Sequence, residues 1–308
     1  RELIYICGKY HLNTKIIGKL SGDTACAGEN TRDSVSNYIH TFLGLDMPKT
    51  QELPEPPALP VRPPVLCAGC PHRASFYAVK TAMKGKKTIF CGDIGCYTLG
   101  NAMPLDMVDT CLCMGAGLNI AQGVEKVEPD TTCFAFVGDS TFFASAITGV
   151  VNAVYNQANM ILVVLDNSTT AMTGHQPHPG TGRTVMGEIV QKINIEQVLQ
   201  GIGVTEIETI NPLELEASVS CVKRMAEKSG VRAIIFKAPC IAVTKPKAPL
   251  HVDQDSCIGC KKCIRDLGCP AIVMNDGKVC IDASMCTGCH LCSQVCPVCA
   301  IAGGDDHE

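Results

Sequence analysis

The stretch TTCFAFVGDSTFFASAITGVVNAVYNQANMILVVLDN, residues 131–167, decides the fold. It begins with a short apolar run, residues 131–138, and ends with a second one, residues 160–166, and both have the length of a strand. The segment between them, residues 142–157, has the length and composition of a helix. A strand, a helix and a strand in this order predict neighbouring parallel strands in a sheet that helices cover.

The same alternation extends on both sides of this stretch. TIFCGDIG at 88–95 and AIIFKAP at 233–239 are further apolar runs, and a helix is predicted at 212–228, begun by Asn211-Pro212. We therefore predict an α/β fold for residues 65–245, a doubly wound and mostly parallel sheet. In such a sheet, ligands bind at the carboxyl ends of the strands.

Two proline-rich segments predict the other domain boundaries. Seven prolines lie within residues 48–64, so residues 46–64 are expected to form a stiff linker. Residues 1–45 would then end a preceding domain, with a helix at 31–45 that ends at Gly44. TKPKAP at 244–249 leads to a small domain, residues 250–308, in which CIGCKKC and CTGCHLC are two copies of one motif.

Composition limits the class of protein. Only 18% of the residues are charged, which is typical of a globular chain with a core, and no apolar run approaches the roughly 18 residues that a membrane helix needs. The net charge is −4, with the acidic excess on residues 251–308, and no basic stripe indicates a nucleic-acid partner. There are 21 cysteines, ten of them between 257 and 299. Adjacent CxxC pairs favour metal ligands over disulfides, and therefore a reducing, cytoplasmic location.

The clearest motif is CTGCHLCSQVCP at 286–297, whose cysteine spacing is that of a bacterial ferredoxin run for a [4Fe–4S] cluster. The fourth ligand of each cluster usually comes from the other run, so we predict two [4Fe–4S] clusters in an α+β ferredoxin-like domain. Five residues, not three, separate the third and fourth cysteines of the first run. Zinc ribbons are the alternative, and they would leave four cysteines without a metal. The predicted ligand sets are Cys257, Cys260, Cys263 and Cys296, and Cys269, Cys286, Cys289 and Cys292.

A further set of cysteines is scattered along the α/β region. Cys67 and Cys70 form a CxxC pair, Cys96 lies in GDIGC and Cys240 in APC. The four either bind a third cluster within this domain or are buried free thiols.

The ends of the two central strands predict a magnesium site. Asp139 offers a carboxylate, Asn167 an amide oxygen and Thr169 a backbone carbonyl, which are the hard oxygen ligands that Mg²⁺ prefers. Gly138 allows a close backbone approach, and the helix that follows Ser140 presents free N–H groups to phosphates. The pattern resembles the motif of thiamine diphosphate enzymes, GDG followed by Asn about 30 residues later, with serine at the third position. The alternative is an ordinary strand-end Asp and a turn Asn.

Two loops are expected to complete this site. CMGAGLNIAQG at 113–123 resembles the loop under the cofactor in thiamine diphosphate enzymes, so Met114 and Gly115 would touch the aminopyrimidine side. Gly95, in the GDIGC loop, is predicted to bind the cofactor as well.

Histidines are the candidates for the reacting end of the site. MTGHQPHPGTG at 172–182 is a polar loop just past the predicted metal ligands, and it contains His175, Gln176 and His178. His72 follows the first CxxC pair. We predict His72 and His175 as catalytic residues, although histidines in such places can equally be surface residues.

Taken together, LCAGCPHRASFYAVK, GDIGCYTLG, CLCMG, GDSTFF, LDNSTTAMTGHQPHPGTG and the twin CxxCxxC runs resemble the alpha subunits of indolepyruvate:ferredoxin oxidoreductases over about residues 61–303. The resemblance implies oxidative decarboxylation of an arylpyruvate by thiamine diphosphate and Mg²⁺. Coenzyme A would take the acyl group as co-substrate, and ferredoxin the electrons. It also implies that the scattered cysteines hold a cluster near thiamine diphosphate.

The resemblance implies partners too. The family's subunit carries a pyrimidine-binding domain, which is expected here in another chain or in a part not included, beside the second (beta) subunit. The chain alone is therefore expected to be catalytically incomplete. Two alternatives stay open: an oxidoreductase for another 2-oxoacid, and an electron-transfer subunit without its own catalysis.

Overall fold

The computed structural model describes residues 1–47, 57–61 and 63–303 and divides the chain into two compact units, Arg1–Arg62 and Pro63–Glu308. The division falls inside the predicted linker. Most of that linker, residues 48–56 and 62, lies outside the described residues.

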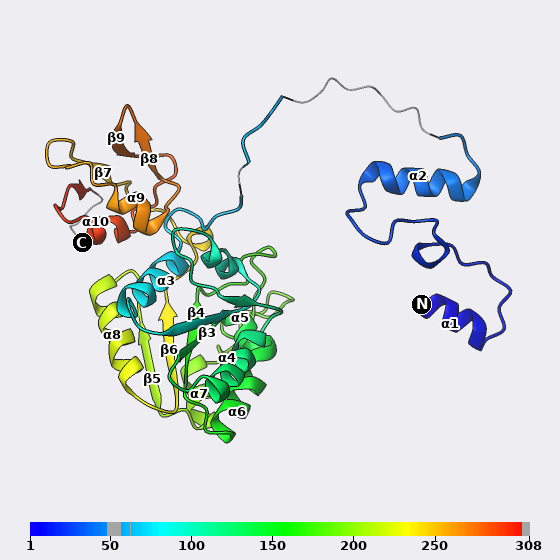
Figure 1. Ribbon diagram of the computed structural model, residues 1–308, viewed down its shortest axis with the longest axis horizontal. Helices are drawn as coiled ribbons and strands as arrows, with labels where there is room; N and C mark the ends of the chain where they lie inside the picture. Colours follow the sequence, from blue (N-terminus) through cyan, green and yellow to red (C-terminus); the bar gives the residue numbers. More distant parts are fainter. Residues whose placement is uncertain (48–56, 62, 304–308) are drawn as a thin grey trace. The chain divides into compact units, whose positions relative to one another are not determined.

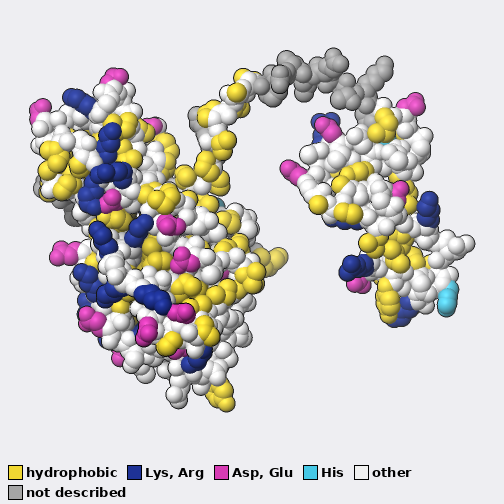
Figure 2. All heavy atoms as spheres, in the orientation of Figure 1, with side chains coloured by type: hydrophobic (Ala, Val, Ile, Leu, Met, Phe, Trp, Pro, Cys, Tyr) yellow, Lys and Arg dark blue, Asp and Glu magenta, His cyan; other side chains and the backbone are white. Residues whose placement is uncertain are grey.

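The first unit consists of short helices with exposed surfaces. It contains α1 (Glu2–Lys9), η1 (Lys19–Ser21) and α2 (Arg32–Leu43). The side chain of Thr31 caps α2 by accepting a hydrogen bond from the Ser34 N–H at 3.2 Å, and Gly44 ends it at a positive φ of 64°. The predicted helix is thus confirmed. No residue of either α-helix is buried, and hydrophobic side chains lie on the surface of this unit (Figure 2).

The second unit is built on a six-stranded sheet in which every neighbouring pair is parallel, as predicted. The spatial order is β2-β1-β3-β4-β6-β5, so β3 and β4 lie at its centre. β5 and the two-residue β2 were not expected from the sequence. The strands are β1 (Thr88–Gly92), β2 (Thr110–Cys111), β3 (Thr132–Gly138), β4 (Met160–Asp166), β5 (Glu206–Ile210) and β6 (Val231–Lys237).

Helices cover both faces of this sheet (Figure 1). Alternate residues of β3 point to opposite faces: Phe134 and Phe136 belong to a core shared with α3 and α8, and Ala135 and Val137 to a core shared with α4, α6 and α7. The fold is therefore doubly wound. The helices are α3 (Pro71–Ala82), α4 (Ala116–Val127), α5 (Asp139–Thr141), η3 (Phe142–Ala146), α6 (Ile147–Tyr155), α7 (Ile195–Ile202) and α8 (Leu215–Glu227), with η2 (Cys96–Asn101) and η4 (Ile241–Val243) in loops.

Phe136 provides a direct test of this packing. Its side chain is fully buried, and its ring centroid lies 4.8 Å from that of Phe76 and 6.2 Å from that of Phe90. We expect Phe136→Ala to lower the free energy of unfolding by about 3–5 kcal/mol, because it leaves a cavity in a dense core. Urea unfolding would measure the change, with Tyr155→Ala as an exposed control. Equal stability of the two variants would contradict the packing described.

The C-terminal part contains the expected internal repeat. Helices α9 (Lys262–Leu267) and α10 (Leu291–Val295) each follow a CxGC loop, and the residue before each helix, Lys261 or His290, has a positive φ near 60°. β7 (His251–Val252) pairs antiparallel with β10 (Ile301–Ala302), and β8 (Ile272–Asn275) with β9 (Lys278–Ile281). Small antiparallel sheets beside two helices confirm the predicted α+β class.

This part shares a core with the α/β sheet. Leu267 of α9 and Leu291 of α10 are buried in the same hydrophobic cluster as Phe76 of α3 and Phe136 of β3. The two regions of the second unit therefore pack together through α3. No helix in the part of the chain that the structure describes is long and apolar enough to cross a membrane.

Candidate cofactor pocket and cysteine clusters

A pocket opens at the carboxyl ends of β3 and β4, where the topology of a parallel sheet places ligands. Its volume is about 180 Å³, and its lining is mostly apolar. Eight of the predicted catalytic and cofactor-binding residues line it: His72, Gly95, Met114, Gly138, Asp139, Ser140, Asn167 and Thr169. Residues from five separate segments of the sequence therefore meet at one site.

Asp139 begins the helix that follows β3, and its side chain is almost fully buried. Burial raises the pKa of the carboxyl above its usual range, although His178 opposes the rise. Its Oδ1 atom accepts a hydrogen bond from the Ser140 N–H at 2.8 Å, whereas Oδ2 has no hydrogen-bond partner among the described residues. A buried carboxylate oxygen without a partner is costly, so this atom is available to a ligand.

The residue facing that oxygen is His178. Its Nε2 atom lies 3.1 Å from Asp139 Oδ2, within ion-pair distance, but the ring is not aligned for a hydrogen bond. The Gly180 N–H donates to Nδ1 at 3.2 Å, so a neutral ring carries its proton on Nε2. The ring also stacks on Phe143, with centroids 5.8 Å apart. These contacts fix His178 with its N–H edge toward the carboxylate.

Asn167 and His72 line the same pocket and contact each other. The Asn167 amide lies 3.2 Å from His72 Nε2, and its Oδ1 accepts from the Thr169 N–H at 3.2 Å. Burial lowers the pKa of His72 to about 4, so the ring is neutral near pH 7 and accepts this hydrogen bond. His72 therefore orients the amide of a predicted metal ligand.

Asp93 holds the Met114–Gly115 loop against the pocket. Its Oδ2 accepts from the Gly115 N–H at 2.6 Å, and its Oδ1 accepts from the Tyr97 hydroxyl. Gly115 has a positive φ of 83°, and a Cβ there would lie 2.7 Å from Ser145 Oγ, so only glycine fits. Gly115, a predicted cofactor-binding residue, therefore lies next to Met114, which lines the pocket.

The buried Asp93 predicts a pH effect on stability. Burial raises the pKa of Asp93 from 3.8 to about 6, so its stabilising contribution is present at low pH and is lost as the pH rises through about 6. Compared with Asp93→Asn, the wild type should lose roughly 1 to 1.5 kcal/mol of unfolding free energy between pH 5 and pH 7.5. Chemical denaturation of both proteins across that window would measure it. A constant difference would show that Asp93 does not titrate there.

His175 lies apart from this arrangement. It sits on the loop after β4 with a positive φ of 61°, its side chain is exposed, and it does not line the pocket. Its predicted catalytic role stays a prediction.

The first ferredoxin set, Cys257, Cys260, Cys263 and Cys296, lines one small apolar cavity. Ile258, Val279 and Ile301 close the cavity. The Cys296 sulfur accepts a hydrogen bond from the Ala300 N–H at 3.3 Å, a contact that stabilises a thiolate. Four thiols from both runs therefore surround one space, as the fourth-ligand rule predicts.

The second ferredoxin set, Cys269, Cys286, Cys289 and Cys292, is also gathered in one place. Burial raises the pKa of Cys292 to about 12, and the other three thiols raise it further by their proximity. In a protein without a metal, such a group would be neutral thiols. Iron binds thiolates, and it lowers the pKa of the thiols it binds.

The embedded set, Cys67, Cys70, Cys96 and Cys240, comes from three loops of the α/β region. Burial is the largest cause that raises the pKa of Cys96, and the sulfurs of Cys240 and Cys67 raise it further by their proximity. These three sulfurs are therefore neighbours. The proximity of Cys67 also raises the pKa of Cys70, so these two sulfurs are neighbours as well. In residues 1–47, 57–61 and 63–303, no three ligands converge as a single metal ion requires. In a four-iron cluster each thiolate binds a different iron, so the sulfurs surround the cluster.

Comparison with known proteins agrees with this geometry. A model of the thiamine pyrophosphate enzyme C-terminal TPP binding domain matches residues 93–236. The indolepyruvate oxidoreductase subunit IorA of Methanothermobacter thermautotrophicus is 40% identical over 308 residues, and the match covers 98% of this chain and 49% of that protein. The IorA subunit of Archaeoglobus fulgidus is 38% identical over 300 residues, with 93% and 48% covered. The chain belongs to the family of IorA subunits.

The chain spans about half the length of these curated relatives. A solved 2-oxoglutarate:ferredoxin oxidoreductase from Magnetococcus marinus superposes with a TM-score of 0.53 at 20% identity, over 60% of this chain and 67% of that one. That likeness supports the fold of the second unit.

The sequence analysis did not predict several residues that line the pocket in this IorA-family chain. Tyr97 has its ring against Gly138, where a Cβ would lie 2.6 Å from the ring, and its hydroxyl lies 3.1 Å from Thr141 Oγ1. Its place directly after Cys96, in a loop already assigned to the site, is the signal that could have found it. The other lining residues that the sequence analysis did not predict are Ile94, Thr141, Leu165, Thr170, Ala171, Met172 and Thr173.

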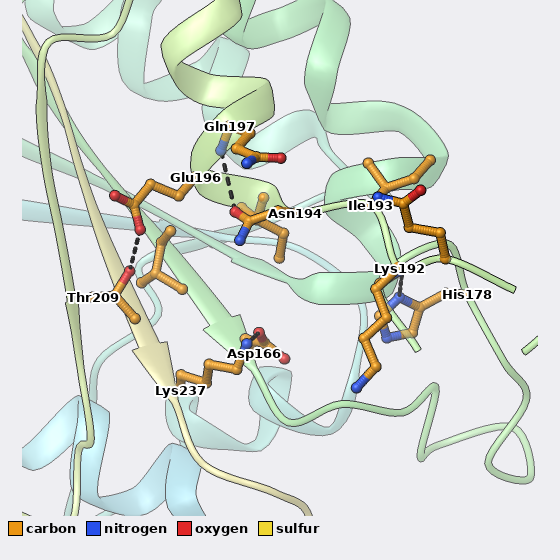
Figure 3. Close-up of a pocket in the computed structure, with 13 residues that line it drawn as sticks. Asp166, His178, Lys192, Ile193, Asn194, Glu196, Gln197, Thr209 and Lys237 are labelled. Atoms are coloured by element: carbon orange, nitrogen blue, oxygen red, sulfur yellow. Dashed lines mark hydrogen bonds and ion pairs between the residues drawn. The ribbon is translucent and has the colours of Figure 1, made fainter. Parts of the chain in front are cut away.

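A second cavity, of about 320 Å³, is lined by Asp166 and His178 among others (Figure 3). Asp166 ends β4 and lies 3.4 Å from Lys237 at the end of β6. Lys192 and Glu196 also line the cavity. Because the lining contains both acidic and basic side chains, it does not indicate whether a ligand would be positively or negatively charged.

Proposed function

We propose that this chain provides the diphosphate-binding half of a thiamine diphosphate site in an oxidoreductase that decarboxylates arylpyruvates such as indolepyruvate. The observation that carries the proposal is the pocket at the ends of β3 and β4, where Asp139, whose Oδ2 makes no hydrogen bond among the described residues, and Asn167 both lie in a lining of predicted cofactor residues. Membership of the IorA family and the match to the TPP binding domain support it.

The residues present fit the cofactor and its cation. Asp139, Asn167 and the Thr169 carbonyl would hold Mg²⁺, because they offer hard oxygen atoms at one edge of the sheet. Gly138 and the helix beginning at Asp139 would hold the diphosphate, since that helix extends through η3 and α6 and presents N–H groups at its first turn. When bound, thiamine diphosphate supplies the carbanion that attacks the 2-keto carbon.

The chain's own residues orient and enclose this chemistry. His72 stays neutral and fixes the Asn167 amide, while Asp93 fixes the loop under the pocket. The apolar lining excludes water, which strengthens electrostatic interactions inside the site. The three cysteine sets would hold [4Fe–4S] clusters, which accept electrons singly and pass them to ferredoxin.

The proposal includes partners and a co-substrate. A pyrimidine-binding half, a beta subunit and ferredoxin would complete the enzyme, and coenzyme A would accept the acyl group. A cytoplasmic location accords with the many free cysteines, because thiols persist in reducing compartments.

Viologen reduction tests this function. The chain, purified without oxygen together with its partners, would be given coenzyme A and, in turn, indolepyruvate, phenylpyruvate, pyruvate or 2-oxoglutarate. We expect fastest reduction with the aryl acids. Preference for pyruvate or 2-oxoglutarate would change the substrate but retain the reaction, whereas no reduction by any acid, with clusters intact and the partners present, would favour an electron-transfer subunit.

A further inference from the structure

The first turn of α3 touches three predicted centres at once. Cys70 precedes the helix, and His72 bonds to Asn167 at the cofactor pocket. Arg73, the next residue, points the other way, into the C-terminal part. One helical turn therefore joins the embedded cysteine set, the pocket and the ferredoxin-like region.

Arg73 makes its hydrogen bonds only to backbone carbonyls. Its Nη1 donates to Leu267 O at 2.7 Å and to Gly268 O at 3.1 Å. Its Nη2 donates to Leu66 O and, at 3.3 Å, to Cys67 O. Two of the acceptors thus belong to Leu66 and to Cys67 of the embedded set, and the other two belong to the residues directly before Cys269 of the second ferredoxin set. The guanidinium ties one ligand loop of each set together.

A second contact brings the same two sets together. Gly69, inside the CAGC loop, has a positive φ of 73°, and a Cβ at this position would collide with the side chain of Thr287. Thr287 lies between Cys286 and Cys289, inside the CTGC loop. The two ligand loops are therefore in direct contact, and the glycine makes this approach possible.

The charge of Arg73 is not explained by packing. The side chain is only 4% exposed, a guanidinium is always charged, and no carboxylate pairs with it among the described residues. A buried charge without a counter-ion is destabilising. A four-thiolate cluster has a net negative charge, so clusters on either side would be the missing counter-ions.

We propose that Arg73 is the positioning residue that fixes the embedded set and the second ferredoxin set at one separation and raises the reduction potential of the clusters they hold. This inference rests on the proposed function, because it needs a cluster in both sets. A nearby positive charge favours the more negative, reduced form of a cluster, and so raises its potential. The planar fork of the guanidinium, which lysine lacks, fixes the geometry.

Two substitutions separate the charge from the fork. In Arg73→Met both are lost, so we expect the potential of a neighbouring cluster to fall and the magnetic coupling between the two clusters to weaken. In Arg73→Lys the charge remains, so the potential should stay near the wild-type value while the coupling weakens. Arg224→Met, an exposed arginine paired with Glu208, is the control and should change neither.

The measurement is an EPR-monitored redox titration of the full chain under anaerobic conditions, with iron analysis of each variant. The first ferredoxin set serves as an internal reference that should keep its potential. Arg73→Met with full iron content and unchanged potentials and coupling would overturn the inference. If the Met variant does not fold, unchanged coupling in Arg73→Lys with full iron content would overturn it, because lysine lacks the fork. About eight irons in the wild-type chain would mean that the embedded set holds no cluster, and the inference would then be wrong. Cofactor binding would still test the thiamine diphosphate site separately.

Discussion

Replacing Asp139 with Asn should abolish the retention of thiamine diphosphate and Mg²⁺. The substitution keeps the shape of the side chain but removes the negative charge of a buried carboxylate that lines the pocket and whose Oδ2 makes no hydrogen bond among the described residues. Mg²⁺ prefers charged, hard oxygen ligands. We expect binding of the cofactor with Mg²⁺ to weaken by at least about 100-fold, which corresponds to roughly 3 kcal/mol. Equilibrium dialysis with the cofactor would measure it.

The control for this experiment is Asp130→Asn, because Asp130 is exposed and outside the pocket. Iron content should be the same in both variants, since Asp139 lies in none of the cysteine sets. If Asp139→Asn binds the cofactor as tightly as the control, the metal assignment is wrong.

Replacing Cys292 with Ser should remove one entire [4Fe–4S] cluster. Cys292 is buried with Cys269, Cys286 and Cys289 around it, and a hydroxyl is a poor substitute for a thiolate on iron. We expect the iron content to fall by about four atoms per chain, with an equal loss of sulfide, because each cluster holds four irons. Colorimetric iron and sulfide analysis of anaerobic protein would measure it.

Cys299→Ser is the matched control. Cys299 lies only a few residues away, but it is exposed and outside both ferredoxin sets. Its replacement should leave the iron content unchanged. Equal iron loss in both variants would contradict the ligand assignment, because it would make Cys299 as important as a buried member of the set.

The strand ends of this fold could be predicted from the sequence because local patterns determine them. β3 and β4 are continuous apolar runs buried on both faces, and a polar residue directly follows each, so Asp139 and Asn167 could be placed at one edge of the sheet. β5 was missed because its residues are only partly buried and include glutamates. β2 has two residues, too few for any periodic signal.

Side-chain directions in loops could not be predicted in the same way. The loop after β4 carries both His175 and His178, and the sequence treats them alike. The structure turns His178 toward Asp139 and leaves His175 exposed, on a loop where both Gly174 and His175 have positive φ values. No periodicity reports such turns.

The role of Arg73 also could not be predicted from the sequence. It bonds to carbonyls about 195 residues further along the chain, and such long-range contacts depend on how two regions pack. By contrast, the cysteine runs could be recognised in the sequence, because three predicted ligands of each cluster lie close together in one run at a spacing typical of such clusters.

The most direct test of the account is whether a 2-oxoacid reduces the clusters. The chain, purified without oxygen with its partners and loaded with thiamine diphosphate and Mg²⁺, would be mixed with indolepyruvate and frozen for EPR. We predict signals of reduced [4Fe–4S] clusters that require both the acid and thiamine diphosphate. Clusters that dithionite reduces, but that no 2-oxoacid reduces while the cofactor is bound, would contradict the claim that the pocket and the cysteine sets act together.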